Sequence, residues 1–136
     1  KKFKKNNVFV VLGDGECGEG SVWEAAMSAP NYGLDNLIVI IDHNKFQQTG
    51  SVENIMNSGK LIEKWNSFGW NTKEVDGHDI NDIHDKISIN TNKKPLAIIA
   101  NTIKGKGFSF SENNNDWHHA VMTKKMYEIG IEELKK

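Results

Sequence analysis

Three short apolar runs, far apart along the chain, are the feature that most limits the fold. They occupy residues 8–12, 37–42 and 96–101, and the last two read LIVIID and LAIIAN. Continuous apolar runs of this length are typical of strands in a parallel sheet, because helices cover both faces of such a sheet. A weaker candidate strand lies at residues 72–75. The pattern predicts an α/β fold with a parallel sheet flanked by helices.

The segments between these runs carry apolar residues at helical spacing. One helix is expected over residues 22–29, where Pro30 should end it. Ser58 and Asp79 are placed to cap two further helices, because their side-chain oxygens can accept from the first free backbone N–H groups. A last amphipathic helix is expected over residues 123–134. The connections between candidate strands are therefore helical, as a parallel sheet requires.

Composition excludes several classes of protein. The chain has 136 residues and a formal net charge of −1, which is not the concentrated basic surface that a nucleic-acid binder needs. Its longest apolar runs are about five residues, whereas a membrane-spanning helix needs roughly 20. The single cysteine, Cys17, rules out a disulfide within the chain and fits a reducing compartment. We expect a cytoplasmic protein that binds neither nucleic acid nor membrane.

The loop after the first apolar run combines glycine with negative charge. Residues 12–20 read LGDGECGEG, with four glycines and three carboxylates in nine residues. A glycine loop between a strand and a helix lets backbone N–H groups approach a phosphate. Asp14 would repel that phosphate unless a divalent cation lay between them. The loop therefore predicts a metal ion, and a hard ion such as Mg²⁺ suits oxygen ligands and phosphates.

A second metal ligand is expected where the next strand ends. That region reads IDHNKFQQTG, and Asn44 follows the strand directly. Ligands of open α/β sheets gather at the carboxyl ends of the strands, so Asn44 should come close to Asp14. The amide oxygen of Asn44 and the backbone carbonyl of Phe46 are neutral, hard donors. These three residues form the predicted metal site.

The same residues resemble a known family signature. GDG followed by Asn about thirty positions later is similar to the thiamine diphosphate motif. The stretches GDGECGEGSVWEAAMSAPNYGLDNLIVIIDHNKFQQTG, FGWNTKEVDGHD, KPLAIIANTIKGKG and DWHH together resemble the transketolase family. The similarity covers roughly residues 8–134 and points to the thiamine diphosphate-binding domain, particularly the N-terminal subunit of split transketolases.

The resemblance implies roles for particular residues. Asp14, Asn44 and the Phe46 carbonyl would hold Mg²⁺, and His118 would be catalytic at the cofactor and substrate site. The residues implied in binding thiamine diphosphate are Gly13, Asp14, Gly15, Glu16, Asn44, Phe46 and His118. Glu16 could instead stabilise the dipole of the helix that follows it.

The resemblance also implies an activity and partners. The expected reaction is reversible transfer of a two-carbon ketol unit between sugar phosphates, as in the pentose phosphate pathway, with Mg²⁺ and thiamine diphosphate as cofactors. Residues 1–136 would be the C-terminal part of the diphosphate-binding domain, incomplete at its N-terminus. The active enzyme would also need a pyrimidine-binding domain or subunit, in a homodimer or heterotetramer. We therefore expect no activity from this chain alone.

Two departures and two alternatives remain open from sequence. His43 precedes Asn44 where the family often has Asn or Asp, and DWHH replaces Trp-His-Gly. Adjacent residues of an extended loop point in opposite directions, so only one imidazole of His118 and His119 should face the site. The alternative among enzymes is a protein similar to 1-deoxyxylulose-5-phosphate synthase, which shares the cofactor motif. A non-catalytic metal or phosphate-binding module acting through a partner is the alternative from a different class.

Overall fold

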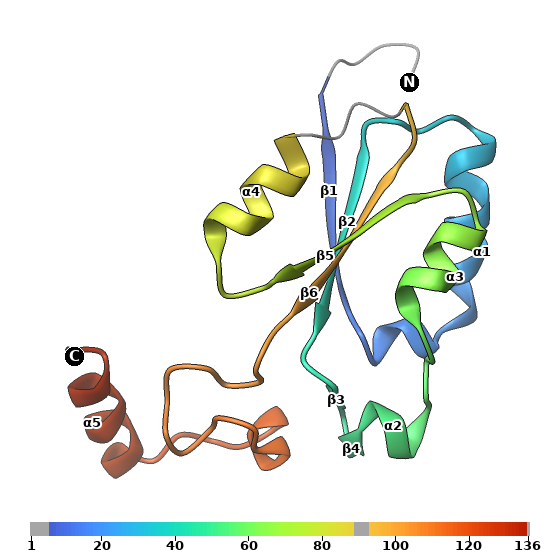
Figure 1. Ribbon diagram of the computed structural model, residues 1–136. Helices are drawn as coiled ribbons and strands as arrows, with labels where there is room; N and C mark the ends of the chain where they lie inside the picture. Colours follow the sequence, from blue (N-terminus) through green and yellow to red (C-terminus); the bar gives the residue numbers. More distant parts are fainter. Residues whose placement is uncertain (1–5, 89–92, 136) are drawn as a thin grey trace.

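A parallel four-stranded sheet organises the molecule. The computed structural model describes residues 6–88 and 93–135 (Figure 1). The strands are β1 (Val8–Gly13), β2 (Leu37–His43), β5 (Asn71–Asp76) and β6 (Leu96–Asn101), in the spatial order β1-β2-β6-β5. All neighbouring pairs are parallel. The predicted α/β class and parallel sheet are confirmed, and the candidate strand at residues 72–75 extends one residue further at each end.

The register of the strands brings their carboxyl ends to one edge of the sheet. Gly13 at the end of β1 lies opposite Asp42 near the end of β2. Asn101 at the end of β6 lies between His43 of β2 and Asp76 of β5. The loops that follow the strands therefore leave the sheet at the same level, which positions their polar residues close together.

Helices cover the sheet on two sides. Helices α1 (Gly20–Asn31) and α3 (Leu61–Ser67) lie on one face, and α4 (Ile80–Ser88) lies on the other (Figure 1). Ala26 and Trp65 pack in the first core, while Ile83 and Ile87 pack against the second. Both faces of β6 are covered, so Leu96 to Ala100 are all buried. This burial on both faces explains the continuous apolar run in the sequence.

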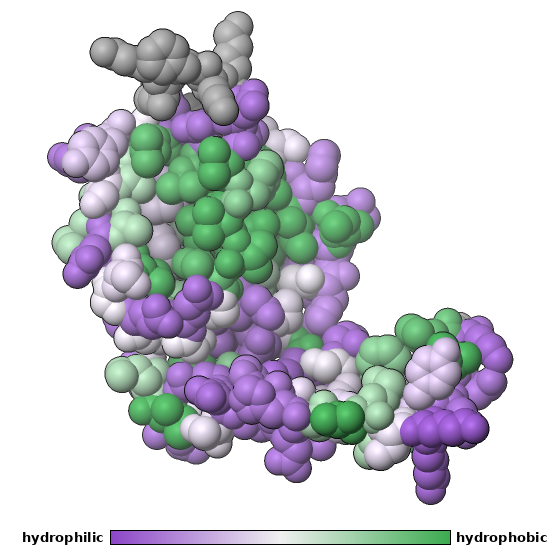
Figure 2. All heavy atoms as spheres, turned by 180° about the vertical axis from the view of Figure 1, so that it is seen from behind, coloured by the Kyte–Doolittle hydropathy of each residue, from purple (hydrophilic) through white to green (hydrophobic). Residues whose placement is uncertain are grey.

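One part of the sheet carries no helix. Phe9 and Val11 of β1 are 53% and 68% exposed, and they share a face with their register partners Ile38 and Ile40. Figure 2 shows a broad apolar surface on this side of the molecule. Helix α4 lies against β5 and β6, so it leaves the β1 end of that face uncovered.

Shorter elements lie beyond the carboxyl edge. A hairpin of β3 (Phe46–Gln47) and β4 (Gly50–Ser51) leads into α2 (Val52–Ile55). The turn η1 (Glu16–Gly18) follows β1, and η2 (Asn115–His118) precedes α5 (Lys124–Glu133). The segment after β6, orange to red in Figure 1, runs away from the sheet and ends in α5. Within the described ranges, every helix is too short or too polar to cross a membrane.

The helix ends show where local signals were sufficient. The Asp79 side chain accepts hydrogen bonds from the backbone N–H groups of Asn81 and Asp82, which confirms it as the cap of α4. The prediction for Ser58 was wrong, because α3 begins after Lys60, which makes no side-chain cap. Ser58 Oγ is instead buried, with no hydrogen-bond partner among the described residues.

The end of α1 was misplaced by sequence for a different reason. The helix continues through Pro30 to Asn31. Proline has no N–H, so it cannot donate to the carbonyl of Ala26 four residues earlier. The indole N–H of Trp70 donates to that carbonyl instead, at 2.8 Å. A contact with a residue far along the chain thus satisfies the acceptor that Pro30 leaves free.

Replacing Trp70 by Phe should expose the importance of this bond. The Ala26 carbonyl would be left without its indole donor, and we expect the free energy of unfolding to fall by about 1–3 kcal/mol in urea titrations. In a Pro30→Ala background the new backbone N–H can donate to Ala26, so Trp70→Phe should cost less there. Equal losses in both backgrounds would assign the cost to ring packing alone.

Candidate active site

The ends of β1 and β2 bring the predicted metal ligands together. Asp14 follows β1 directly, and its backbone N–H donates to the carbonyl of Asp42 on β2 at 3.2 Å. The Asp14 residue is 1% exposed. A carboxylate so deeply buried requires donors or a cation, because desolvating an unpaired charge is costly.

Only one oxygen of the Asp14 carboxylate has a partner among the described residues. Oδ2 accepts from the backbone N–H of Lys45 at 2.5 Å. Oδ1 is buried and accepts no hydrogen bond from the part of the chain that the structure describes. Burial raises the pKa of Asp14 above its ordinary value, although the backbone N–H groups of Lys45 and Gly15 and the nearby His43 act against the increase. A cation at Oδ1 would favour the ionised form and remove the unpaired acceptor.

The loop after β2 is bent so that its backbone faces Asp14. Lys45 has a φ of 69°, a left-handed conformation that is uncommon for a residue with a side chain. Asn44 Oδ1 accepts from the N–H of Phe46 at 2.9 Å, and its Nδ2 donates to Asp42 at 3.1 Å. The Asn44 amide is thus held by Asp42 and Phe46, and it lines the same pocket as Asp14.

The glycine loop packs closely against the β3–β4 hairpin. A Cβ built on Gly15 would lie 2.5 Å from the Cβ of Gln47. The Gly13 N–H donates to the Glu16 carboxylate at 3.1 Å, so this side chain holds the loop's own backbone. Gly15 is therefore required for the close approach of the loop and the hairpin.

A pocket of about 350 Å³ collects the predicted residues. Its lining includes all the residues predicted to bind metal or cofactor: Gly13, Asp14, Gly15, Glu16, Asn44, Phe46 and His118. Glu19, Gln47, Gln48 and Lys104 complete the lining. Residues that follow three strands and a residue of η2 therefore meet at one cavity.

His118 enters the pocket from the segment after β6. Its Nδ1 lies 3.3 Å from Nζ of Lys104. The pKa of His118 is below its ordinary value, because neighbouring atoms partly desolvate the exposed ring and because Lys104 and His119 contribute positive charge. A lowered pKa favours the neutral imidazole, whose Nδ1 can accept a hydrogen bond from the lysine ammonium.

The adjacent histidines His118 and His119 do not lie in the extended loop that the sequence predicted. His118 ends the 3₁₀ turn η2 and His119 caps it, so the two residues are not in an extended loop. Their rings lie 4.7 Å apart and nearly perpendicular. His118 lines the pocket, and His119 is not part of the lining.

Sequence reasoning missed Lys104 and Gln48. Lys104 lies just beyond the carboxyl end of β6, in the stretch NTIKGKG. The rule that located Asn44 after β2 applies equally to a lysine after β6, so position was a usable signal. Gln48 lies in the hairpin turn, where its sequence context resembles any polar turn.

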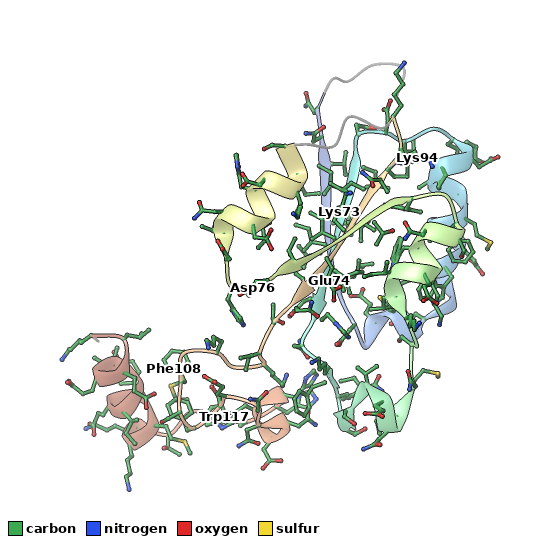
Figure 3. The ribbon with its side chains drawn as sticks, in the orientation of Figure 1. Lys73, Glu74, Asp76, Lys94, Phe108 and Trp117 are labelled. Atoms are coloured by element: carbon green, nitrogen blue, oxygen red, sulfur yellow. The ribbon has the colours of Figure 1, made fainter. Side chains whose placement is uncertain are left out.

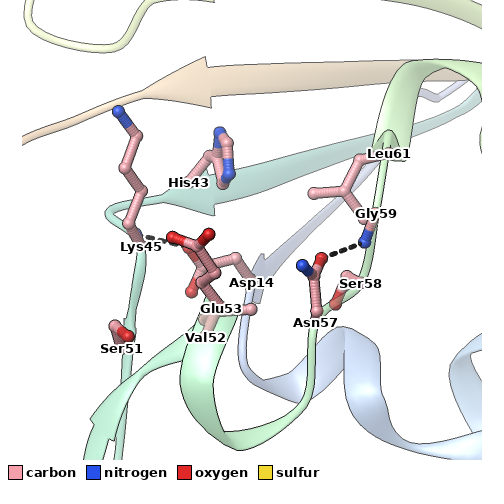
Figure 4. Close-up of a pocket in the computed structure, with 10 residues that line it drawn as sticks. All are labelled: Asp14, His43, Lys45, Ser51, Val52, Glu53, Asn57, Ser58, Gly59 and Leu61. Atoms are coloured by element: carbon pink, nitrogen blue, oxygen red, sulfur yellow. Dashed lines mark hydrogen bonds between the residues drawn. The ribbon is translucent and has the colours of Figure 1, made fainter.

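Asp14 also lines a second pocket of about 270 Å³ (Figure 4). His43, Lys45, Ser58 and Leu61 contribute to its wall. In this pocket Asn57 accepts from the N–H of Gly59 at 2.7 Å. Asp14 therefore lines both pockets, and the backbone N–H of Lys45 holds its carboxylate.

The donor set fits one hard cation. In the described residues no group of three or more His, Cys, Asp or Glu side chains is placed to hold a metal. Asp14 offers one unpaired carboxylate oxygen, and Asn44 and Phe46 offer neutral oxygens nearby. One carboxylate with neutral oxygens suits Mg²⁺, which keeps other positions for phosphate and water.

Cys17 is unsuited to nucleophilic chemistry. It is 2% exposed, and burial, followed by the negative charges of Asp14 and Glu16, raises its pKa to about 12. The reactive thiolate is therefore scarce near neutral pH.

Comparisons with known proteins agree with this geometry. Residues 1–135 match the family described as "Transketolase, thiamine diphosphate binding domain". An apulose-4-phosphate transketolase subunit of Actinobacillus succinogenes is 46% identical across 99% of this chain and 49% of its own length. The 6-deoxy-6-sulfo-D-fructose transketolase subunit of a Clostridium species is 40% identical across 96% of this chain and 48% of its own length.

Larger proteins share the same region. The crystal structure of transketolase from Campylobacter jejuni superimposes with a TM-score of 0.89 and 26% identity, covering 96% of this chain and 21% of that one. The chain spans about half the length of the transketolase subunits that it matches.

Gly15→Ala should test the contact between loop and hairpin. The added methyl would force the two apart, and we expect the free energy of unfolding to fall by about 1–3 kcal/mol in denaturant titrations. Gly20 supplies the matched control, because a Cβ there meets nothing within 4 Å. Gly20→Ala should be neutral, or stabilising by up to about 1 kcal/mol. Similar losses in both variants would contradict a specific contact at Gly15.

Proposed function

The chain belongs to the transketolase family of thiamine diphosphate-binding domains, and from this premise we propose that it forms the diphosphate-binding side of a ketol-transferring active site. The reaction would be reversible transfer of a two-carbon ketol unit between sugars. The observation that carries the proposal is the buried, unpaired Oδ1 of Asp14 beside Asn44 at the ends of adjacent parallel strands. A cation in the pocket would pair with this oxygen and with an anionic ligand at the same time.

The proposed cofactors are Mg²⁺ and thiamine diphosphate. Asp14, Asn44 and the Phe46 carbonyl would hold the metal, and Gly15, which lines the same pocket, would contact the diphosphate. Lys104 would neutralise part of the diphosphate charge. When bound, thiamine diphosphate supplies the carbanion-stabilising chemistry of ketol transfer. The chain's own residues bind and orient it.

His118 is the proposed proton-transferring residue. Its Nδ1 faces Lys104, and a neutral ring that accepts the lysine's hydrogen bond at Nδ1 carries its proton on Nε2, which would donate to a substrate oxygen. The lowered pKa of His118 favours the neutral ring, whose Nδ1 lone pair can accept from Lys104. Lys104 would hold the ring in one orientation by donating to Nδ1.

The substrates and partners are proposed from the relatives. Two relatives are named for apulose 4-phosphate and for 6-deoxy-6-sulfo-D-fructose, so we propose sugars carrying a phosphate or sulfo group as substrates. Because these relatives are named as subunits, we propose that a pyrimidine-binding domain or subunit completes the site, in a homodimer or heterotetramer. A cytoplasmic location remains part of this proposal.

Linked binding of metal and cofactor tests the function. In the full-length protein with its partner, calorimetric titration should show tight thiamine diphosphate binding only with Mg²⁺, because carboxylate and diphosphate repel each other without it. Asp14→Ala should weaken this binding at least about 100-fold, since even indirect metal-site residues cost 10–100-fold. Cys17→Ala is the control and should bind normally. Equal affinity with and without Mg²⁺ would refute the proposed site.

Substitutions of the two histidines test the catalytic assignment. In the assembled enzyme, His118→Ala should lower kcat/KM for ketol transfer by about 10²-fold or more. His119→Ala should have a far smaller effect, because His119 does not line the pocket. The opposite order of effects would move the proton-transferring role to His119. Activity confined to condensation with pyruvate would favour the synthase alternative instead.

A further inference from the structure

The side chain of Asn115 makes a two-point contact with the β3–β4 hairpin. With its amide oriented to pair both groups, its nitrogen donates to the carbonyl of Gln47 at 3.1 Å, and its oxygen accepts from the N–H of Gly50 at 3.0 Å. Gln47 and Gly50 are themselves a register pair of the hairpin. The Asn115 amide therefore contacts the hairpin through a matched donor and acceptor, as a neighbouring peptide group would.

The other side of η2 is held by aromatic packing. The Trp117 ring lies 4.9 Å from that of Phe110, which stacks on Phe108 at 5.6 Å. Phe108 also packs against Gly130 of α5, because a Cβ built on Gly130 would lie 3.2 Å from the Phe108 ring. Figure 3 shows Phe108 and Trp117 in the segment between the sheet and α5. His118 therefore directly follows Trp117, which packs within this segment. It lies three positions after Asn115, which bonds to the hairpin.

The hairpin is also the element that carries the proposed metal loop. Phe46 begins β3, and the preceding Lys45 N–H holds the Asp14 carboxylate. A ligand that fixes Phe46 and Asp14 would fix Gln47 and Gly50, because these residues form the same short hairpin. The Asn115 amide can keep both of its hydrogen bonds only when the two backbone groups keep their spacing.

We propose that Asn115 is a positioning residue that couples occupation of the metal loop to the placement of His118. This inference rests on the proposed function. Ordering of the hairpin by metal and diphosphate would favour the state in which Asn115 is paired, and pairing would hold η2 with His118 at the pocket. The coupling comes from the two hydrogen bonds of Asn115, because they form when the hairpin is ordered and are lost when the hairpin moves.

Hydrogen exchange on the full-length protein with its partner tests the coupling directly. Adding Mg²⁺ with thiamine diphosphate should slow exchange of the backbone amides of residues 116–119. In Asn115→Ala this protection should be lost, and cofactor affinity should fall by only about 5- to 10-fold, because the coupling is reciprocal but the metal ligands are untouched. Glu112→Ala, an exposed position in the same segment, should retain the protection.

A double-mutant cycle separates positioning from general stability. Asn115→Ala should lower kcat/KM about 10-fold, the scale of one or two lost neutral hydrogen bonds. In the His118→Ala background it should have no further effect, because it acts through His118. Asn115→Asp keeps the acceptor for Gly50 but turns a carboxylate oxygen toward the Gln47 carbonyl, so it should lose the exchange protection as Asn115→Ala does. This variant tests the same bond should Asn115→Ala fold poorly.

The outcomes distinguish this inference from the proposed function. If the wild-type protein bound no Mg²⁺ and thiamine diphosphate, the proposed function and the coupling would both be overturned. If it bound them but Asn115→Ala kept full protection of residues 116–119, only the coupling would be overturned. If Asn115→Ala lowered kcat/KM equally in the wild-type and His118→Ala backgrounds, again only the coupling would be overturned.

Discussion

The hydrogen bond from the Lys45 N–H to the Asp14 carboxylate is the interaction on which the site depends. A buried carboxylate at the end of a strand is unfavourable without a donor. Lys45 reaches it because its left-handed φ of 69° turns the chain back toward β1. The same turn begins the hairpin that carries Phe46 and meets Gly15 and Asn115. The Lys45 N–H thus joins the glycine loop to the β3–β4 hairpin, which in turn contacts the segment that carries His118.

The parts of the fold that sequence could predict are those governed by local pattern and strand direction. Strands buried on both faces are continuously apolar, so β2 and β6 were recognisable from composition alone. Parallel strands end at one edge, and this geometry predicted that Asp14 and Asn44 would meet. Helix ends were harder. Pro30 stays inside α1 because Trp70, distant in sequence, donates to the free Ala26 carbonyl.

Beyond β6 the sequence contains little periodic information. Residues 102–123 form turns and a short 3₁₀ helix, so neither the two-residue nor the 3.6-residue repeat applies. The positions of Lys104 and Asn115 depend on contacts with other segments, His118 in one case and the β3–β4 hairpin in the other. Such contacts leave no trace in local composition. The family resemblance pointed to His118, which lines the pocket whereas His119 does not, but the 3₁₀ turn that separates the two rings replaces the expected extended loop.

The position of β6 in the sheet has a consequence for the order in which the chain can assemble. β6 is the last of the four sheet strands in the sequence, yet it lies between β2 and β5. During synthesis, β5 has no strand to pair with until residue 101 has left the ribosome, because its described partner is β6. Helix α3 can form earlier, but the two strands that it contacts, β5 and β6, are then not yet paired. Pairing of β5 into this sheet should therefore be a late, long-range step.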